Sequence, residues 1–344
     1  MVDPALALLV FALVVTGLVG LLWPRRGLVA RLSKLVRPTW RTRLEDALKR
    51  LYDAEYSVKP CSLESLAGAL EISRTRAVKL VAHLELVGLV RSAGPALALT
   101  DRGRAEALRI VRSHRLWERY LADRTGVSPA DWHDDAERRE HTMSPGVVEE
   151  LASAMGHPLY DPHGDPIPTA RGDLPPQSGI ALTALRPGQQ ATVVHLEDEP
   201  REVYEQIVAA GLAPRTQVQM LDATPQRLRF TADGHQRVLK PVVATNVTVA
   251  PLPAEAVPHR PLETLSDLHP GESASVIEIA PACQGSHRRR LLDLGLVPGT
   301  VVRAELRGAF REPVAYRIRG ALIALRAQQA DWVRIERRSP TGAE

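Results

Sequence analysis

The sequence predicts a multidomain α+β protein with three parts of different character. An uncharged apolar run opens the chain (residues 5–23), capped segments with helical periodicity follow (42–143), and a β-rich repeat comes last (181–300). With 344 residues, the chain has room for two to four small domains. An apolar content of 44% with only 4% aromatic residues indicates domains whose cores are mostly aliphatic.

Overall charge and cysteine content say little about function by themselves. The formal net charge is +4 and the pI is about 9.3, which is only mildly basic. The basic residues are unevenly placed, because residues 25–43 contain seven Lys or Arg and no acid. The two cysteines, Cys61 and Cys283, lie far apart and predict no disulfide framework, which fits a reducing compartment.

The apolar run over residues 5–23 predicts a transmembrane helix. It carries no charge, Thr16 is its only polar side chain, and a helix of this length spans the ~30 Å hydrocarbon layer. Arg25 and Arg26 follow at once, so the positive-inside rule predicts a single-pass protein of the inner (cytoplasmic) membrane with its C-terminal bulk in the cytoplasm. The alternative, a cleaved signal peptide, needs a basic start and a small-residue cleavage site, and neither is evident. Residues 27–36 fit either a short amphipathic helix on anionic headgroups or a basic linker.

Two short helices separated by a tight turn are predicted next. Ser62 is a favourable N-cap for a helix over residues 63–70, and Ser73 is one for a helix that ends near Gly88. This is the helix-turn-helix arrangement of DNA-binding proteins. The second helix presents polar and basic side chains near its start, where phosphate contacts need them. These side chains are Arg74, Thr75, Arg76 and Lys79.

The elements on either side of this helix pair complete a winged helix-turn-helix. Residues 42–54 have leucines at helical spacing and predict a preceding helix. Residues 89–91 and 96–99 predict two strands around a turn that contains Gly94, as a wing would.

Two further predicted helices carry potential metal ligands on one face each. His114 and Glu118 are four residues apart on the first of these helices, so they share a face. Glu137, Glu140 and His141 share a face on the second. Carboxylates and imidazoles without sulfur suit Mn²⁺ or Fe²⁺ rather than a structural zinc cluster. The alternative is a solvated acidic face whose charges are balanced by the two arginines within it.

Residues 114–168 resemble the dimerisation and metal-binding region of the DtxR/MntR family of iron- and manganese-dependent transcription repressors. The segments that carry the resemblance read HRLWERYLAD, WHDDAERREHTMSPGVVEEL and GHPLYDPHGDPIP. The resemblance extends over most of the chain after the first forty residues. It implies a homodimer that binds a palindromic operator in double-stranded DNA and takes Mn²⁺ or Fe²⁺ as its cofactor. It also implies that Ser73, Thr75 and Lys79 occupy the positions that approach DNA.

By this resemblance, a primary regulatory site takes Asp46 from the first helix of the winged domain. Glu137, Glu140 and His141 complete it from the dimerisation helix. Iron-sensing members have methionine at the position of Asp46 and cysteine at that of Glu137, so carboxylates at both resemble the manganese-responsive branch. Manganese-responsive members carry a further acid three residues after Asp46, where this chain has Lys49. This departure implies a single ion or a rearranged second site rather than a two-metal cluster of that type.

The resemblance also implies an ancillary metal site. Its ligands on the helices would be His114, Glu118 and His133, and His114 fits either site. The family adds an acid and an amide from the following barrel, but no acid here aligns cleanly, so Glu199 and Glu202 are candidates. Two histidines also have a structural interpretation. His133 is placed to cap its helix, and His163 is interpreted as a turn residue rather than a ligand.

The C-terminal part contains an internal duplication. Residues 181–196 parallel residues 264–279, and residues 207–216 parallel residues 291–300. Each copy has short alternating strands, a Pro-Gly turn and one short helix, which predicts a small SH3-like barrel. The second copy resembles FeoA, the small cytoplasmic protein of ferrous-iron transport. No nucleophile–base pair or glycine-rich phosphate loop occurs in either copy, so an enzyme is not predicted.

Together these patterns predict a membrane-tethered homodimer that regulates transcription for metal homeostasis in response to Mn²⁺ or Fe²⁺. The alternative is a membrane-bound adaptor of a ferrous-iron or manganese transporter that acts through its FeoA-like barrels. The predicted divisions of the chain are a transmembrane anchor (1–24), a basic linker (25–38), a winged helix (39–104), a dimerisation and metal-binding domain (105–165), a proline-rich linker (166–178), and two FeoA-like (SH3-like) barrels (179–252 and 263–338).

Overall fold

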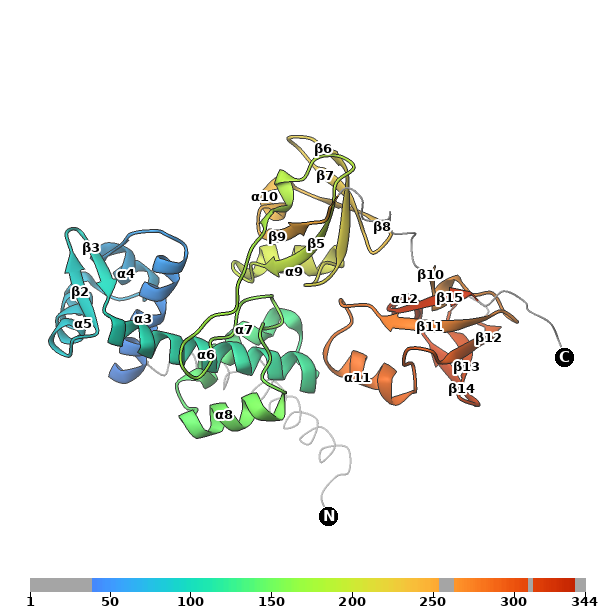
Figure 1. Cartoon of the computed structure of the whole chain (residues 1–344), viewed down its shortest axis with the longest axis horizontal. Coiled ribbons are helices and arrows are strands. Elements are labelled where there is room, and N and C mark those ends of the chain that lie inside the picture. Colours follow the sequence, from blue (N-terminus) through green and yellow to red (C-terminus); the bar gives the residue numbers. More distant parts are fainter. Residues whose placement is uncertain (1–38, 254–262, 309–311, 338–344) are drawn as a thin grey trace, which may run out of the picture. The chain divides into compact units, whose positions relative to one another are not determined.

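The computed structural model describes residues 39–253, 263–308 and 312–337 (Figure 1). The predicted transmembrane helix and basic linker lie outside the described residues. Within the described ranges, none of the helices combines the length and apolar character that a membrane crossing requires. Contacts along the chain divide it into two compact units, one ending at Ala107 and the other beginning at Leu108.

The first unit has the order of elements predicted for a winged helix. It contains α3 (Trp40–Tyr56), β1 (Cys61–Ser62), α4 (Leu63–Ala69), α5 (Arg74–Leu86), β2 (Val90–Ala93) and β3 (Ala96–Leu99). The strands form an antiparallel sheet in the order β1-β3-β2. The side chains of Ser62 and Ser73 cap α4 and α5 as predicted. Strand β2 begins one residue later than predicted because the N–H of Leu89 still donates to the carbonyl of Leu84 at the end of α5 (2.9 Å).

Aliphatic side chains at helical spacing hold this unit together. Leu51 of α3, Leu66 of α4, and Leu80 and Leu84 of α5 are all buried. Each contributes about 1.5–3 kcal/mol by removing its side chain from water. Leu80 and Leu84 occupy the buried face of α5. Arg74, Arg76 and Lys79 lie outside this face and are exposed to solvent.

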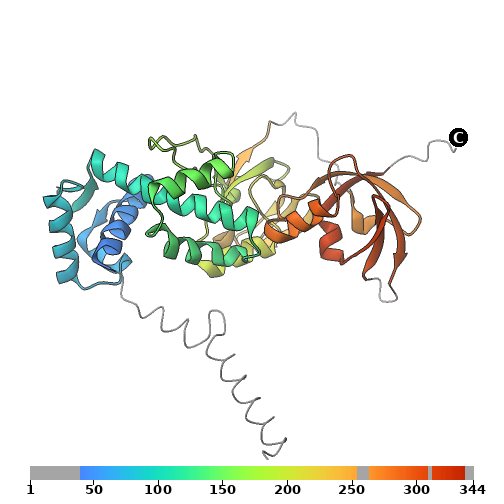
Figure 2. The ribbon, with the colours of Figure 1, turned by 90° about the horizontal axis from the view of Figure 1, so that it is seen from below.

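The second unit begins with three helices that lie side by side in both views (Figure 1, Figure 2). They are α6 (Asp101–Arg124, whose first residues belong to the first unit), α7 (Trp132–Glu140, after a 3₁₀ turn at Pro129–Asp131) and α8 (Pro145–Ala154). Trp132 is fully buried against Leu121 of α6, and its indole N–H donates to the carbonyl of Val127 (3.0 Å). This anchor sets the position of the residue that follows it, His133, against α6.

The predicted barrels correspond to two six-stranded antiparallel sheets with the same strand order. The first sheet contains β4 (Ile180–Ala181), β5 (Gln190–Leu196), β6 (Gln217–Ala223), β7 (Leu228–Ala232), β8 (His235–Leu239) and β9 (Val247–Pro251), with helices α9 (Arg201–Ala209) and α10 (Pro241–Ala244). The second contains β10 (Glu263–Thr264), β11 (Ser273–Ile279), β12 (Val301–Arg307), β13 (Val314–Ile318), β14 (Ala321–Leu325) and β15 (Val333–Arg337), with α11 (Gly285–Asp293) and α12 (Ala327–Asp331). Even a strand irregularity repeats, because β5 shifts register between Val193 and His195 and β11 shifts between Val276 and Glu278.

The loop that follows α8 is fastened to the first sheet. One carboxylate oxygen of Asp161 accepts hydrogen bonds from the N–H groups of His163, Gly164 and Asp165 (2.8–2.9 Å). The carbonyl of His163 accepts from the N–H of Leu196 at the end of β5 (2.9 Å). The loop therefore joins the three helices to the first sheet and places His163 between them.

Candidate metal centre

His114 lies between two carboxylates. Its Nε2 is 3.0 Å from Oε1 of Glu118, one turn further along α6, and its Nδ1 contacts Oε2 of Glu140 at the end of α7. All three side chains are buried. The pair on α6 follows from helical spacing, whereas the contact with Glu140 depends on how α7 packs against α6.

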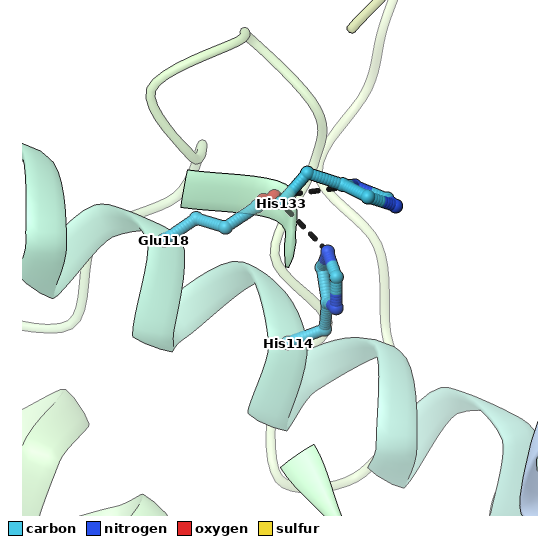
Figure 3. Close-up of side chains that lie close together, drawn as sticks. All are labelled: His114, Glu118 and His133. Atoms are coloured by element: carbon cyan, nitrogen blue, oxygen red, sulfur yellow. Dashed lines mark hydrogen bonds and ion pairs between the residues drawn. The ribbon is translucent and has the colours of Figure 1, made fainter. Parts of the chain in front are cut away.

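His133 of α7 completes a compact group with His114 and Glu118. His114 and Glu118 project from one face of α6, and both imidazoles approach the same carboxylate (Figure 3). One ligand atom from each residue lies within 4.8 Å of the other two. The structure therefore brings together the three residues that the resemblance assigns to the ancillary site.

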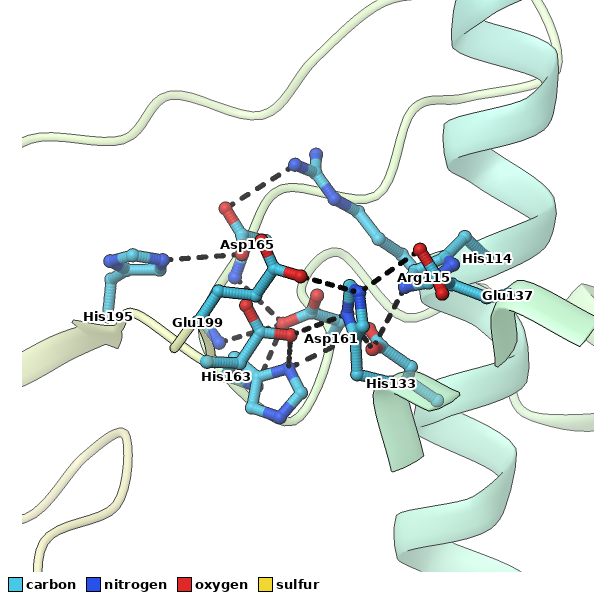
Figure 4. A network of polar contacts seen from close by, with 12 residues as sticks. His114, Arg115, His133, Glu137, Asp161, His163, Asp165, His195 and Glu199 are labelled. Atoms are coloured by element: carbon cyan, nitrogen blue, oxygen red, sulfur yellow. Dashed lines mark hydrogen bonds and ion pairs between the residues drawn. The ribbon is translucent and has the colours of Figure 1, made fainter. Parts of the chain in front are cut away.

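The imidazole of His133 contacts four carboxylates. Two of them, Glu137 and Glu199, are labelled in Figure 4. Its Nδ1 is 2.8 Å from Oδ2 of Asp198 and 3.6 Å from Oε1 of Glu118. Its Nε2 is 3.3 Å from Oε1 of Glu199 and 3.5 Å from Oε1 of Glu137. Asp198 and Glu199 come from the loop after β5, so the first sheet supplies two of the four acids.

His163 belongs to the same cluster. Its Nδ1 lies 3.7 Å from Oε2 of Glu118 and 3.8 Å from Oδ2 of Asp198, and its side chain is only 2% exposed. The interpretation of His163 as a turn residue is therefore incomplete: it does lie in a turn, but the hydrogen bonds of that turn hold its imidazole inside the cluster.

Burial and neighbouring carboxylates oppose each other in setting the pKa values of the cluster. Burial lowers the pKa of His133, but the negative charges of the neighbouring carboxylates, Asp198 foremost, outweigh burial and raise the pKa well above the ordinary value. Burial also lowers the pKa of His163, and Glu118 foremost among its neighbours raises it to about 10. Burial raises the pKa of Asp198, yet the two histidines hold it at about 2. Without a metal, His133 and His163 are thus protonated and paired with carboxylates, and metal binding must release their protons.

The residues assigned to the primary site are distributed over both units. Glu140 is buried, and its Oε1 is 3.5 Å from Nε2 of His141, which caps the C-terminus of α7. Glu137 is 56% exposed and contacts His133. Asp46 lies half-buried on α3 of the first unit, with Lys49 three residues after it on the same helix.

The cluster fits a divalent cation in both composition and geometry. It offers imidazole nitrogen and carboxylate oxygen without sulfur, which suits Mn²⁺ or Fe²⁺. The Nδ1 atom of His133 is buried and makes no well-aligned hydrogen bond with any residue that the structure describes, although Oδ2 of Asp198 is only 2.8 Å away. Such a close but misaligned pair is expected of donor atoms that converge on a common point instead of on each other.

Asp198 was not among the ligands predicted from the sequence. The available signal was a run of three acids, Glu197, Asp198 and Glu199, directly after β5. Of the two candidates chosen instead, Glu199 does contact His133. Glu202 is exposed on the first turn of α9, and among the described residues it forms no ion pair with a histidine of the cluster.

The predicted DNA-binding residues lie at the exposed start of α5. They are Ser73, Arg74, Thr75, Arg76 and Lys79. Arg74 forms an ion pair with Glu64 of α4 (3.2 Å), but both side chains are more than half exposed, so this pair contributes little to stability. The segment therefore presents cationic side chains to solvent.

Two parts of the chain match known protein families. Residues 100–169 match the iron dependent repressor, metal binding and dimerisation domain, and residues 263–337 match the FeoA domain. The iron-dependent repressor IdeR of Mycobacterium bovis is 30% identical over 208 residues, which span 56% of this chain and 90% of that protein. The diphtheria toxin repressor of Corynebacterium efficiens is 31% identical over 186 residues, which span 51% of this chain and 81% of that protein.

A solved structure shows the same relationship. A manganese-dependent transcriptional repressor in complex with manganese is similar to this chain with a TM-score of 0.56 and 31% sequence identity, over 61% of this chain and 100% of the other. The order of elements, the carboxylate–imidazole cluster and the FeoA domain together define the class of metal-responsive transcription repressors. The chain belongs to the DtxR/IdeR family of iron- and manganese-dependent repressors. Family membership confirms the resemblance drawn from the sequence and the prediction of a regulator rather than an enzyme.

Proposed function

We propose that this chain is a transcription regulator of metal homeostasis that binds a palindromic DNA operator as a homodimer when Mn²⁺ or Fe²⁺ is bound. Its relatives named as iron-dependent repressors support the DNA-binding function. The matched domain type, named for metal binding and dimerisation, supports the homodimer. Carboxylates at Asp46 and Glu137, together with a relative solved with manganese, favour Mn²⁺.

The position of His114 carries this proposal. Its two ring nitrogens contact Glu118 and Glu140, so the residues assigned to the ancillary and primary sites form one connected network. A change in what Glu140 binds at the primary site therefore also changes the contacts that the imidazole of His114 makes at the ancillary site. Such a network serves metal sensing better than stability, because a buried ion pair adds little net stability.

Asp46 on α3 is proposed to complete the primary site with Glu137, Glu140 and His141. The ion supplies the positive charge that lets these carboxylates share one site. Because residues of both units would bind the same ion, metal binding is proposed to favour one placement of the winged helix relative to the helical domain. Only a difference in affinity between two arrangements shifts their populations, and by reciprocity DNA then tightens metal binding. Typical couplings of ~1–3 kcal/mol change an affinity about 5- to 150-fold.

The start of α5 is proposed to enter the major groove of DNA. Arg74, Arg76 and Lys79 supply charge for phosphate contacts, and Ser73 and Thr75 supply short hydrogen-bonding side chains. In a two-fold dimer, two such helices read half-sites about one helical turn, or a multiple of it, apart.

Residues 5–23 are proposed to anchor this regulator in the inner membrane, with the C-terminal bulk in the cytoplasm. The support comes from the sequence: the run is uncharged, and Arg25 and Arg26 follow it directly. Both anchors of a dimer enter the same membrane face if the two-fold axis runs along the membrane normal.

A DNA-selection experiment on the full-length protein in detergent micelles tests the proposal. Duplexes are selected from a random pool with Mn²⁺, with Fe²⁺ under anaerobic conditions, and with EDTA, and the affinity of the enriched duplex is then measured. We expect metal-dependent, salt-sensitive binding that Glu140→Ala and His141→Ala weaken. An absence of DNA affinity with either metal would contradict the regulator and favour the transporter adaptor.

A further inference from the structure

A cleft of about 530 Å³ opens within the second unit. Its walls come from the C-terminal part of α6, the loop after α8, the segment before β6, and the region from the end of β11 through α11. Among the described residues that line it, none is assigned to the candidate metal centre. Its size lies within the range of about 300–1,000 Å³ that is typical of small-molecule sites.

Arginines outnumber acids in the lining of this cleft, five to three. Each of the three acids already has partners of its own. A carboxylate oxygen of Asp123 accepts a hydrogen bond from Arg119 (2.8 Å), and Glu278 pairs with Arg334 (2.5 Å). Asp161 accepts the backbone N–H groups of its turn. These acids therefore leave most of the arginine charge in the cleft uncompensated.

Three of the arginines have side chains without a partner among the described residues. They are Arg124 at the end of α6, Arg215 before β6, and Arg289 on α11. Like charges gathered in one cleft repel one another, and the cleft concentrates their field toward anions. A bound anion removes this repulsion. The charge pattern therefore favours an anionic ligand.

The backbone of Arg215 is strained in a way that its counterpart in the repeat avoids. Arg215 has a φ of +75°, in the left-handed region that side chains with a Cβ rarely adopt. The matching residue of the second copy is Gly299, with a φ of +84°. The fold therefore accepts glycine at this position, and the first copy carries an arginine despite the strain. Strained positions of this kind cluster at functional sites, and the strained residue here lines the cleft.

The walls of the cleft are held in place without a ligand. Arg334 of β15 is buried and pairs with Glu278 of its own sheet and with Asp233 of the first sheet. The N–H of Arg215 donates to the carbonyl of Val193 in β5 (2.7 Å). Because these contacts fix the backbone of the walls, a ligand has little of the site left to order, which favours affinity.

The remaining lining indicates what kind of anion fits. Arginine side chains present N–H donors in a planar fork that matches the oxygens of a phosphate group. Three separate guanidinium groups suit a ligand with more than one such group. The other part of the wall is apolar and can hold an organic part of the ligand; it consists of Pro162, Pro214, Ile279, Pro281 and Leu292.

We propose that this cleft binds a small molecule that carries two or more phosphate groups, with Arg124, Arg215 and Arg289 contacting the phosphates. A nucleoside polyphosphate and inorganic pyrophosphate share this chemistry. The inference goes beyond metal-dependent DNA binding and is independent of it, because the cleft shares no residue with the metal centre.

Isothermal titration calorimetry on the full-length protein in detergent micelles tests this site with ATP, pyrophosphate and citrate, in EDTA so that chelated metal does not contribute. The principal variant is Arg215→Gly, which installs the residue of the second copy and relieves the left-handed backbone. Its matched control is Arg319→Gly, because Arg319 is an exposed arginine with a φ of +48° that does not line the cleft. Arg289→Gln and Arg290→Gln form a second pair on α11, of which only Arg289 lines the cleft.

ATP, pyrophosphate or both should bind in a salt-sensitive manner, and the tighter of the two identifies the source of the phosphates. Arg215→Gly and Arg289→Gln should each lower the affinity about 10-fold or more, whereas Arg319→Gly and Arg290→Gln should leave it unchanged. Urea denaturation should find neither glycine variant less stable than the parent, because relief of strain offsets the added chain entropy. A loss of affinity in Arg215→Gly then reports the site and not unfolding.

Three results would overturn the proposal. One is the absence of binding by both phosphate ligands, and another is citrate binding as tight as theirs. The third is an equal loss of affinity in the cleft variants and their controls. A weakening of DNA binding in Arg215→Gly with ATP affinity unchanged would also contradict it, because the arginines would then contact nucleic acid.

Discussion

The Nδ1 atom of His133 on α7 lies 2.8 Å from Oδ2 of Asp198, which follows strand β5. This contact brings a carboxylate of the first sheet to the metal-binding helices. The sheet is therefore part of the candidate centre and not an appended domain. The second copy of the repeat has Ala280, Pro281 and Ala282 where the first has Glu197, Asp198 and Glu199, so the two copies differ at this loop.

Replacing Asp198 should weaken metal binding more than replacing a nearby acid outside the cluster. We expect Asp198→Asn to reduce Mn²⁺ affinity about 10- to 100-fold, the range seen when a residue that orients or supports a metal site is removed. Isothermal titration calorimetry on the full-length protein measures the change. Glu202→Gln, on the first turn of α9, is the control, and an equal loss in both variants would contradict the assignment of Asp198.

Glu140 should matter more than Glu137 for metal-dependent DNA binding. Glu140 is buried and contacts both His114 and His141, whereas the side chain of Glu137 is 56% exposed. We expect Glu140→Gln to abolish most of the metal-induced gain in DNA affinity, about 5- to 150-fold. Fluorescence anisotropy with the selected duplex, with and without Mn²⁺, measures this gain. A larger loss in Glu137→Gln would show that the exposed acid is the principal ligand.

The pH dependence of stability should change sign when metal binds. The pKa of His163 is about 10 in the folded protein and 6.5 when unperturbed, so the folded state holds this proton more tightly. The resulting stabilisation is fully present below pH 6.5 and is lost as pH rises toward 10. In EDTA we therefore expect the urea midpoint to fall between pH 6.5 and 8.5. With saturating Mn²⁺ it should rise over the same interval, because metal binding releases protons. If the urea midpoint changes with pH in the same direction in EDTA and in saturating Mn²⁺, the histidines do not bind the metal.

Substitutions at the start of α5 should weaken DNA binding without changing metal content. Arg76→Ala and Lys79→Ala each remove one exposed cation from this segment. We expect lower affinity and, for each phosphate that the variant no longer neutralises, a salt-dependence slope that is smaller by about 1. Arg186→Ala, an exposed position before β5, is the control. If it lowers affinity equally, the DNA-binding surface lies elsewhere.

Gly164→Ala should displace the loop that carries His163. Gly164 has a φ of +98°, and a Cβ there would lie 2.0 Å from the carbonyl oxygen of Val194. Gly156→Ala separates backbone strain from steric clash, because the φ of Gly156 is also positive (+74°) but no atom of the described residues lies within 4 Å of an added Cβ. We expect Gly156→Ala to lower the free energy of unfolding by about 1–2 kcal/mol. Gly164→Ala should lower it by about 3 kcal/mol or more. Urea denaturation measures both, and equal losses would show that the loop can move away from β5.

Local rules account for much of the helical part of the molecule. The serine caps of α4 and α5, and the shared face of His114 and Glu118, follow from hydrogen bonding and spacing within a few residues. The duplication likewise predicted two sheets of one topology, because the same pattern folds in the same way twice. Each of these features depends on neighbours that are near in sequence.

By itself, the sequence determined the helices, the repeat and the types of donor atoms that the molecule offers to a metal. Only the tertiary structure decided which donors meet, and it selected Asp198 and His163 over Glu202. The reason is physical: which carboxylate of the loop after β5 reaches His133 depends on how the first sheet docks against α6 and α7. No periodicity along the chain encodes that packing.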